Sequence, residues 1–437
     1  MSGPLHVAHG RGLLVAAPSS GAGKTTVTLG LLRALRDAGH PVRGAKSGPD
    51  YIDPRFHEAA TGQPCPNLDA WAMDNATLRG LAAGPGLCVV EGAMGLFDGA
   101  AGGGGSAADL ARALDLPVVL VVDAARMAQS VAPLVAGFAA HDPEVTVAGV
   151  ILNRVGSARH EAMLRAACPL PVLGALPRDA GLSTPSRHLG LVQAAERPDL
   201  DAFLDRAAAA MRAGCDLDAL AALARPLAGA APPRFDPPAQ RVAVARDEAF
   251  AFAYPHLLDG WRRAGAEIRL FSPLADEPAP PADLVLLPGG YPELHAGRLA
   301  GNARFLSSLR DRAVHGECGG YMVMGDALTD ADGTAHRMAG LLRLETSFAA
   351  RRLHLGYRSL RAERGPFRGA WAGHEFHYAT TLRAEGTPLF EATEADGTPL
   401  PPMGLRHGAA TGSFAHLIAP TALYPHNPAL DARLPRA

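Results

Sequence analysis

Two short segments contain residues whose types and spacing could do chemistry. Residues 316–320 read Gly-Glu-Cys-Gly-Gly and follow a run of strand-forming residues. The pattern Gly-x-Cys-x-Gly is typical of a nucleophile elbow, which holds Cys318 on a tight turn between a strand and a helix. Residues 19–26 read Ser-Ser-Gly-Ala-Gly-Lys-Thr-Thr. The chain therefore combines a thiol for acyl transfer with a candidate phosphate loop.

The phosphate loop lies between an apolar strand ending at Ala17 and a helical pattern closed by Gly39. In this context the backbone N–H groups and the positive helix end hold phosphate. We expect Lys24 to neutralise the phosphate and the Thr25 hydroxyl to bind Mg²⁺. Pro18 stands where the usual loop has glycine, so a simple turn with a solvated lysine is the alternative. The predicted ATP-binding residues are Ser20, Gly21, Ala22, Gly23, Lys24, Thr25 and Thr26.

Carboxylates for a metal follow several predicted strands. Glu91 and Asp123 come directly after apolar runs, and ligands of open α/β sheets gather at the carboxyl ends of strands. Asp50 and Asp53 lie in the Gly-Pro-Asp-Tyr-Ile-Asp-Pro stretch at residues 48–54. Glu91 is the first choice after Thr25. Helix capping for Asp123 and turn formation for Asp50 and Asp53 stay open as alternatives.

A thiol nucleophile needs a base, and His416 is the best candidate because it follows a strand-like stretch late in the same domain. His315, His354, His374 and His377 compete for the role. The helix start after Cys318 should favour the thiolate, and a buried structural cysteine is the alternative. The N–H groups of Gly290 and Gly319 are candidates for an oxyanion hole.

Residues 374–377 read His-Glu-Phe-His, which invites a metal interpretation. The spacing is one residue short of the zinc-protease pattern, and two histidines three apart in a strand point to opposite faces. We therefore predict no zinc site there.

The elements that must position these residues read as two α/β domains. Unbroken apolar runs at residues 12–17, 87–90, 117–122 and 145–152 predict buried parallel strands of a doubly wound domain. An Ala- and Pro-rich stretch at residues 222–239 is the best linker candidate, and a second α/β pattern restarts at residue 241. We predict domains at residues 1–235 and 236–437.

Composition limits the functional classes. The chain has 437 residues and a formal net charge of -2 without basic runs, which gives no electrostatic reason to bind nucleic acid. No segment reads as a signal peptide or membrane span, so we expect no membrane partner and a cytoplasmic protein. The five cysteines are far apart, which favours neither disulfides nor a zinc cluster.

Six stretches together carry a family resemblance: residues 46–54, 67–69, 91–99, 185–191, 316–322 and 373–378. With them the chain resembles the corrinoid a,c-diamide synthases, which amidate cobyrinic or hydrogenobyrinic acid in cobalamin biosynthesis. The resemblance implies an N-terminal P-loop domain like that of dethiobiotin synthetase and a C-terminal domain like the class I glutamine amidotransferases.

The resemblance also implies the substrates and the roles of residues. L-Glutamine would supply ammonia through Cys318 and His416, and Mg-ATP would phosphorylate a carboxylate of the corrinoid, which ammonia then converts into an amide. It implies Thr25, Glu91 and Asp50 as metal ligands, with Asp53 and Asp98 in substrate activation. A homodimer is left open.

Three alternatives remain. The macrocycle could be another one, as in nickel-sirohydrochlorin a,c-diamide synthase or cobyric acid synthase. A regulatory P-loop ATPase with an inert tail is a third reading, against which the intact elbow argues.

Many class I amidotransferases carry Glu two residues after the histidine, but this chain has Ile418 there, so the group that orients His416 is open.

Overall fold

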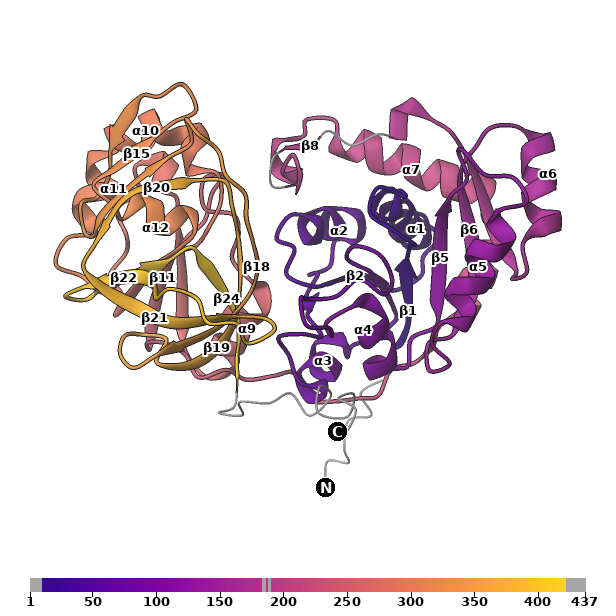
Figure 1. The fold of residues 1–437 in the computed structure, drawn as a ribbon, viewed down its shortest axis with the longest axis horizontal. Helices are drawn as coiled ribbons and strands as arrows, with labels where there is room; N and C mark the ends of the chain where they lie inside the picture. The colour runs from indigo at the N-terminus through magenta and orange to yellow at the C-terminus, as the bar shows by residue number, and fades with distance from the viewer. Residues whose placement is uncertain (1–9, 183–185, 188–189, 422–437) are drawn as a thin grey trace. The chain divides into compact units, whose positions relative to one another are not determined.

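The computed structural model describes residues 10–182, 186–187 and 190–421. It divides the chain into two compact units, one of residues 10–99 and 104–233 and one of residues 100–103 and 234–421 (Figure 1). The domain boundary expected after residue 235 stays a prediction. Among the described helices, none combines the length and the apolar character needed to cross a membrane.

The first unit is built on a parallel sheet with the strand order β3-β2-β4-β1-β5-β6-β7. Its strands are short apolar runs, most of them buried, as a sheet covered on both faces requires. The predicted doubly wound fold is thereby confirmed. The strands are β1 (Arg11–Ala16), β2 (Val42–Ser47), β3 (Asn67–Leu68), β4 (Leu87–Glu91), β5 (Val118–Asp123), β6 (Val147–Val155) and β7 (Val172–Pro177).

Helices cover both faces of this sheet. Helix α1 packs against α2 and α7 on one face, and α3 lies with α4 on the other (Figure 1). The helices are α1 (Lys24–Asp37), α2 (Asp53–Thr61), α3 (Asn75–Ala82), α4 (Ala107–Leu114), α5 (Val131–Ala140), α6 (Ala158–Ala167), α7 (Leu200–Gly214) and α8 (Leu217–Leu223). Short 3₁₀ turns are η1 (Ala180–Leu182) and η2 (Ala194–Glu196), and β8 (Ser186–Arg187) pairs with β9 (Gly190–Leu191).

The strand order creates a topological switch point between β1 and β4. From β1 the chain crosses β4 to reach β2, and from β4 it crosses β1 to reach β5. The loops that leave these two neighbouring strands therefore diverge at their carboxyl ends, the place where α/β proteins bind ligands. The phosphate loop and Glu91 both lie at this edge.

The predicted linker is partly ordered. The Ala- and Pro-rich stretch at residues 222–239 begins with the end of α8 and includes β10 (Arg225–Pro226), which pairs antiparallel with β1. Strand β10 has only two residues and pairs at the start of β1, outside the main strand order of the sheet. A proline such as Pro226 is tolerated in a short strand of this kind.

The second unit contains a sheet with the order β12-β11-β13-β14-β23-β22-β21-β18-β19-β24. The strands from β12 to β23 run parallel, and those that follow pair antiparallel. They are β11 (Arg241–Ala245), β12 (Glu267–Phe271), β13 (Leu284–Leu287), β14 (Val314–Glu317), β18 (His354–Ala362), β19 (Gly369–His377), β21 (Thr387–Glu394), β22 (Met403–His407), β23 (Ala410–Ser413) and β24 (Ala415–Pro420).

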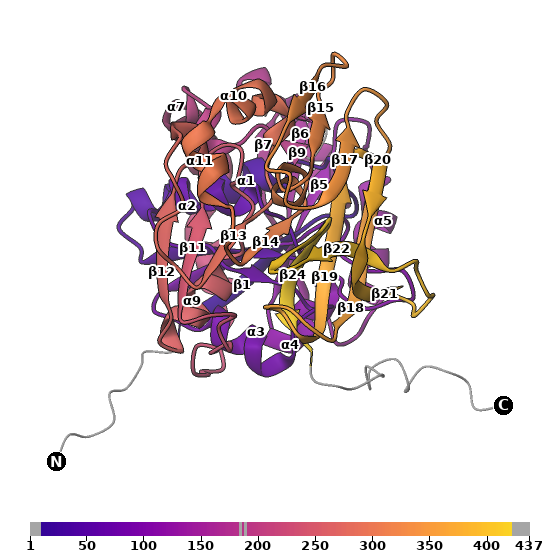
Figure 2. The same ribbon diagram turned by 90° about the vertical axis from the view of Figure 1, so that its left-hand side faces the viewer.

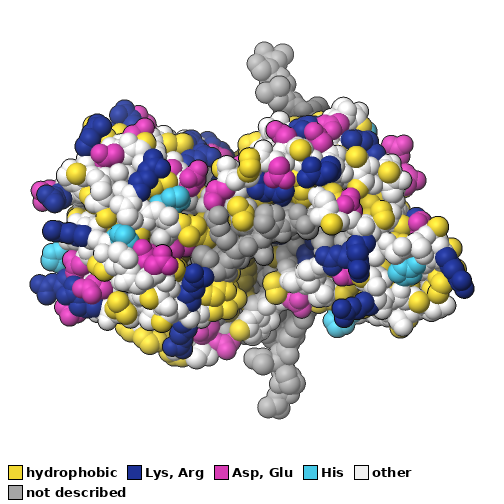
Figure 3. Space-filling model, turned by 90° about the horizontal axis from the view of Figure 1, so that it is seen from above, with side chains coloured by type: hydrophobic (Ala, Val, Ile, Leu, Met, Phe, Trp, Pro, Cys, Tyr) yellow, Lys and Arg dark blue, Asp and Glu magenta, His cyan; other side chains and the backbone are white. Residues whose placement is uncertain are grey.

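A smaller sheet and short helices complete the second unit, which faces the viewer in Figure 2. The small sheet has the order β16-β15-β17-β20 and consists of β15 (Ala327–Thr329), β16 (Ala335–Arg337), β17 (Arg343–Ser347) and β20 (Thr380–Glu385). The helical segments are α9 (Pro255–Arg263), η3 (Pro273–Ala275), η4 (Pro292–His295), α10 (Ala296–Gly301), α11 (Ala303–Ser308) and α12 (Gly319–Val323). Acidic and basic side chains are interspersed on the face shown in Figure 3.

Candidate active sites

The phosphate loop connects β1 to α1 in the first unit. Gly21 and Gly23 have φ angles of 81° and 93°, which residues with a side chain rarely adopt, and Lys24 is the first residue of α1. The Lys24 ammonium donates to the carbonyl of Met94 at 2.5 Å and to that of Ser19 at 3.3 Å. The lysine is thus folded back over its own loop and over the segment that follows β4. Burial, followed by the nearby charge of Lys46, lowers its pKa.

The rest of the predicted ATP loop is ordered by neighbouring strands and turns. The Asn153 amide donates to the carbonyl of Ala22 at 2.9 Å, and the Thr26 hydroxyl donates to the carbonyl of Leu182 at 3.3 Å. Asp123 accepts a hydrogen bond from Ala125 N and forms an ion pair with Arg154. These contacts of Asp123 are a turn and an ion pair rather than a helix cap, because the next helix begins only at Val131.

A buried polar network lies beside the loop and centres on Glu91. Residues Lys46 of β2 and Glu91 of β4 are opposite each other in the parallel sheet. Glu91 Oε1 accepts hydrogen bonds from the Thr25 hydroxyl at 2.6 Å and from Lys46 Nζ at 2.9 Å. Glu91 Oε2 lies 2.7 Å from His57 Nε2. Glu91 and His57 are fully buried, and Lys46 nearly so.

The charges of this network stabilise one another. Burial alone would raise the pKa of Glu91, but Lys46 and a hydrogen bond from His57 hold that pKa well below its usual value. Burial alone would lower the pKa of Lys46, and the carboxylates of Asp53 and Glu91 reverse the effect and raise it. Lys46 is therefore a permanent cation and Glu91 a permanent carboxylate near neutral pH.

The other predicted carboxylates lie close to this network. Asp53 is buried and pairs with Lys46 at 2.7 Å, while burial, followed by the charge of Asp50, raises the Asp53 pKa to about 7. Asp50 Oδ1 accepts from the main-chain N–H groups of Ile52 and Asp53 at the start of α2. Asp98 Oδ2 accepts from Gly95 N at 2.8 Å. Hydroxyl and carboxylate oxygens are the ligands that Mg²⁺ prefers, so Thr25, Glu91 and Asp50 fit that ion by donor type.

The predicted nucleophile elbow is present in the second unit. Cys318 connects β14 to α12 with φ 47° and ψ −106°, a strained backbone conformation for a residue with a side chain. A methyl group on Gly320 would lie 1.8 Å from the carbonyl oxygen of Leu287. The glycine therefore lets the turn pass directly against β13, which explains the spacing of the motif.

His416 lies within β24, in the same buried region as Cys318. A methyl group on Gly289 would lie 2.1 Å from His416 Nε2 and 3.2 Å from Cys318 Cβ. The imidazole and the cysteine side chain therefore border the same small space. The structure brings together the two residues that the sequence analysis paired.

The two candidate oxyanion donors also lie at the elbow. A methyl group on Gly319 would lie 3.1 Å from Gly290 N, so the turn after β13 packs against the turn that carries Cys318. The Gly319 N–H hydrogen-bonds the Cys318 sulfur and slightly opposes the rise in its pKa. Both N–H groups thus lie near the thiol.

The expectation of a ready thiolate is wrong for this resting structure. Burial, followed by the charge of Glu293, raises the pKa of Cys318 far above its ordinary value. Burial lowers the pKa of His416 to about 3, and the neighbouring His374 ring adds to that shift. Helix α12 has only five residues, so its dipole does not offset the loss of hydration. The pair is a neutral thiol beside a neutral imidazole.

The place of the usual orienting glutamate holds no carboxylate, because residue 418 is isoleucine. Ile418 lies in β24, and its carbonyl oxygen is 2.7 Å from His256 Nε2. Glu317, next to the nucleophile, accepts from Leu417 N at 3.1 Å, and burial raises its pKa to about 8. The main-chain carbonyl of His374, which is opposite His416 in the sheet, acts as an acceptor and raises the His416 pKa against the effect of burial.

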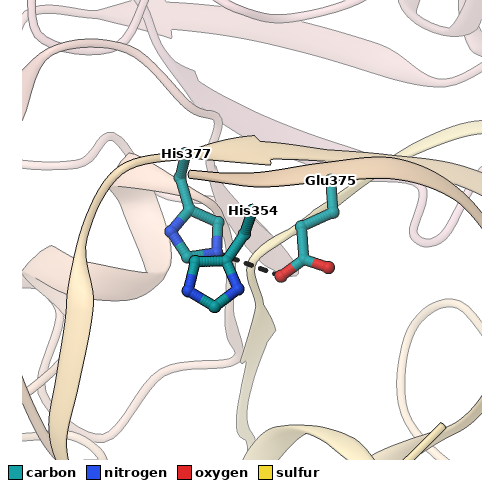
Figure 4. Close-up of side chains that lie close together, drawn as sticks. All are labelled: His354, Glu375 and His377. Carbon is teal, nitrogen blue, oxygen red and sulfur yellow. Dashed lines mark hydrogen bonds and ion pairs between the residues drawn. The ribbon is translucent and has the colours of Figure 1, made fainter. Parts of the chain in front are cut away.

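A second cluster of His354, Glu375 and His377 lies on β18 and β19 (Figure 4). Their ligand atoms lie within 4.8 Å of one another. The two imidazole rings are stacked with only 7° between their planes, so a single ion cannot lie in the plane of both rings. The Arg358 guanidinium already pairs with Glu375 at 2.9 Å. This geometry disfavours a zinc site, and its absence stays a prediction.

Lys46 and His57 are buried at the nucleotide site, but the sequence analysis gave them no role. A lysine inside a buried strand is one signal that could have found Lys46. Asp53 and His57 are four residues apart and so share a face of α2, which is a signal for His57. The stretch at residues 185–191 lies outside the residues whose side chains the structure describes.

Comparisons with known proteins match both units. A family model described as a CobQ/CobB/MinD/ParA nucleotide binding domain matches residues 13–192, and one described as a CobB/CobQ-like glutamine amidotransferase domain matches residues 241–422.

Full-length relatives are named hydrogenobyrinate a,c-diamide synthase. The one from Brucella anthropi is 56% identical over 428 residues, covering 93% of this chain and 98% of the relative. Those from Rhizobium meliloti and Rhodobacter capsulatus are 55% and 54% identical, covering 93% and 94% of this chain and 99% of each relative.

Proposed function

Because the chain belongs to the hydrogenobyrinate a,c-diamide synthase family, we propose that it amidates the a and c acetate carboxylates of a corrin precursor with glutamine and ATP. The observation that carries the proposal is that one chain holds both a cysteine elbow with a buried histidine and a phosphate loop joined to Glu91. The names of the relatives favour hydrogenobyrinic over cobyrinic acid as substrate.

The first reaction is hydrolysis of glutamine at Cys318. The sulfur attacks the side-chain amide carbon while His416 takes the thiol proton, and the N–H groups of Gly290 and Gly319 stabilise the oxyanion. The proton then passes to the leaving nitrogen, which departs as ammonia and leaves a thioester. Water hydrolyses the thioester to glutamate and regenerates the thiol.

The neutral state of the pair shapes this step. Because burial disfavours both the thiolate and the imidazolium, proton transfer must accompany the attack rather than precede it. A buried site also protects ammonia from protonation, which would make it unreactive.

The second reaction uses ATP to activate a carboxylate of the macrocycle. The carboxylate attacks the γ-phosphorus, ADP leaves, and ammonia then displaces phosphate from the acyl phosphate to form the amide. Residues 20–26 would hold the nucleotide, and Asp53 and Asp98 would act on the substrate side. Mg²⁺ held by Thr25, Glu91 and Asp50 would neutralise phosphate charge when bound.

Mass spectrometry of the macrocycle tests the proposal. Hydrogenobyrinic and cobyrinic acids are incubated with the protein, glutamine and Mg-ATP, and the ratio of their rates identifies the preferred substrate. We expect two successive ATP-dependent replacements of a hydroxyl by an amino group. Cys318→Ser should lose the reaction with glutamine and retain it with ammonia. No mass change with either nitrogen source would refute the proposed substrate, and four replacements would point to cobyric acid synthase activity.

A further inference from the structure

His57 is a buried histidine of the first unit for which the proposed reaction has no role so far. It lies on α2, is fully shielded from solvent, and places Nε2 2.7 Å from Glu91 Oε2. The other ring nitrogen, Nδ1, has no hydrogen-bond partner within the described residues. Within the described part of the chain, the ring therefore directs its hydrogen bonding at one carboxylate oxygen.

With that contact, the two carboxylate oxygens of Glu91 have different hydrogen-bond partners. Oε1 accepts from Thr25 and Lys46, and Oε2 is left to His57. An ionised carboxylate is an acceptor only, so His57 must carry its proton on Nε2 and donate it. With both oxygens engaged, the carboxylate cannot rotate without breaking a buried hydrogen bond.

The fold makes room for this contact. A methyl group on Gly44 of β2 would lie 2.6 Å from His57 Nδ1 and 2.9 Å from its Cβ, so only glycine lets the ring sit against the strand. One turn earlier on the same helix face, Asp53 holds Lys46. Helix α2 thus contributes two side chains to the network: Asp53 pairs with the Lys46 ammonium, and His57 hydrogen-bonds the Glu91 carboxylate.

We propose that His57 is a positioning residue that fixes the Glu91 carboxylate for the magnesium ion of the bound nucleotide. The inference rests on the proposed function, in which Thr25 and Glu91 meet that ion. Groups that hold a ligating carboxylate in place typically change metal affinity by about 10- to 100-fold when removed. His57 acts through Glu91 and does not itself touch the nucleotide.

The first test measures the Mg²⁺ concentration that half-saturates binding of a fluorescent ATP analogue to the full-length protein. His57→Leu and His57→Asn, which cannot reach Glu91, should raise that concentration by about 10- to 100-fold. His57→Gln places an amide N–H near the position of Nε2 and should recover most of the loss. His40→Leu replaces an exposed histidine of the same unit and should have no effect. Hydrogen exchange of peptides from α2 and β2 reports that the first unit of each variant is folded.

The second test needs no metal. A long-range ¹⁵N–¹H spectrum of the histidine rings should show a proton on Nε2 of His57, with its signals assigned by their loss in His57→Gln. Glu91→Gln should shift those signals. A wild-type spectrum without a proton on His57 Nε2, or an unchanged Mg²⁺ requirement in His57→Leu, would overturn the inference alone. A wild-type protein that hydrolyses glutamine but binds no Mg-nucleotide would overturn the proposed function and the inference together.

Discussion

At the scale of single residues, the environment of a group decides its chemistry more than its type does. Cys318 and His416 would suggest a thiolate–imidazolium pair, yet both side chains are buried, and burial disfavours the charged form of each. The pKa of His416 is lowered to about 3 and that of Cys318 is raised. The reactive forms, a neutral base and a neutral thiol, thus coexist over a wide pH range.

This pair predicts an unusual pH profile for glutamine hydrolysis. Since kcat/KM reports the ionisations of the free enzyme, it should stay flat from about pH 5 to about pH 8, with no loss of rate near the ordinary histidine pKa. Initial rates of glutamate release across that range would measure it. A fall in kcat/KM as the pH decreases through the ordinary histidine pKa would mean that the imidazole is hydrated in solution, contrary to this structure.

Lys46 shows the same dependence on surroundings. Lys46→Met removes the counter-ion of Glu91 and Asp53 while keeping the side-chain length, so two buried carboxylates lose their partner. We expect the unfolding free energy of the first unit to fall by about 3 to 5 kcal/mol. Urea unfolding followed by hydrogen exchange of peptides from α2 and β2 would measure the change.

The control for Lys46 is an exposed ion pair in the same unit. Glu161→Gln breaks the pair with Arg165 on α6, where both side chains are more than a third exposed. It should change the unfolding free energy by less than about 1 kcal/mol. Equal effects of the two substitutions would contradict the importance assigned to the buried network.

At the scale of elements, local sequence predicted the strand–loop–helix units but not their partners. The apolar run before residue 19 and the Gly-x-Cys-x-Gly pattern are local signals, and β1–α1 and β14–α12 form where they indicate. The contact between Lys46 and Glu91 arises only when β2 pairs with β4, and that between Glu91 and His57 only when α2 packs beneath. The sequence analysis predicted Glu91 at the end of its strand, but these contacts between distant segments carry no local pattern, so its partners Lys46 and His57 went unrecognised.

The elbow element gives a sharp prediction about packing. Gly320→Ala would place a methyl group 1.8 Å from the Leu287 carbonyl, and because a backbone atom of a central strand cannot move aside, the elbow must shift. We expect a loss of about 2 to 3 kcal/mol in stability and loss of glutamine hydrolysis. Thermal unfolding and glutamate release would measure both effects.

Gly301 is the matched control because a methyl group there meets nothing within 4 Å. Gly301→Ala, at the end of α10, should be neutral or stabilising by up to about 1 kcal/mol. If Gly320→Ala behaved like Gly301→Ala, the close approach of the elbow to β13 would be wrong.

At the scale of the whole molecule, buried neutral histidines are concentrated in the second unit. Burial lowers the pKa of His256 and His374 to about 4 and that of His315 and His416 to about 3. The unfolded chain binds protons to these groups below the ordinary histidine pKa, and the folded unit does not. The contribution of these histidines to its stability is therefore complete above that pKa and is lost as the pH falls from there toward 3.

We thus expect the second unit to unfold in mild acid. At a pH of about 4.5 each such histidine removes roughly 2 to 3 kcal/mol of stability, and a domain has only about 5 to 15 kcal/mol in total. In a Trp71→Phe background the remaining tryptophans, Trp261 and Trp371, both belong to the second unit. Their fluorescence during acid titration would therefore report that unit alone.

His315→Asn separates this mechanism from general acid denaturation. His315 Nδ1 lies 2.9 Å from the Thr411 hydroxyl, and an asparagine amide can replace that contact without titrating. With one proton-binding site removed from the unfolded chain, the dependence of stability on pH should weaken by roughly one quarter, because the four histidines contribute alike. The acid midpoint should move to lower pH. An unchanged midpoint and slope would mean that carboxylates, rather than the buried histidines, set the acid stability of this unit.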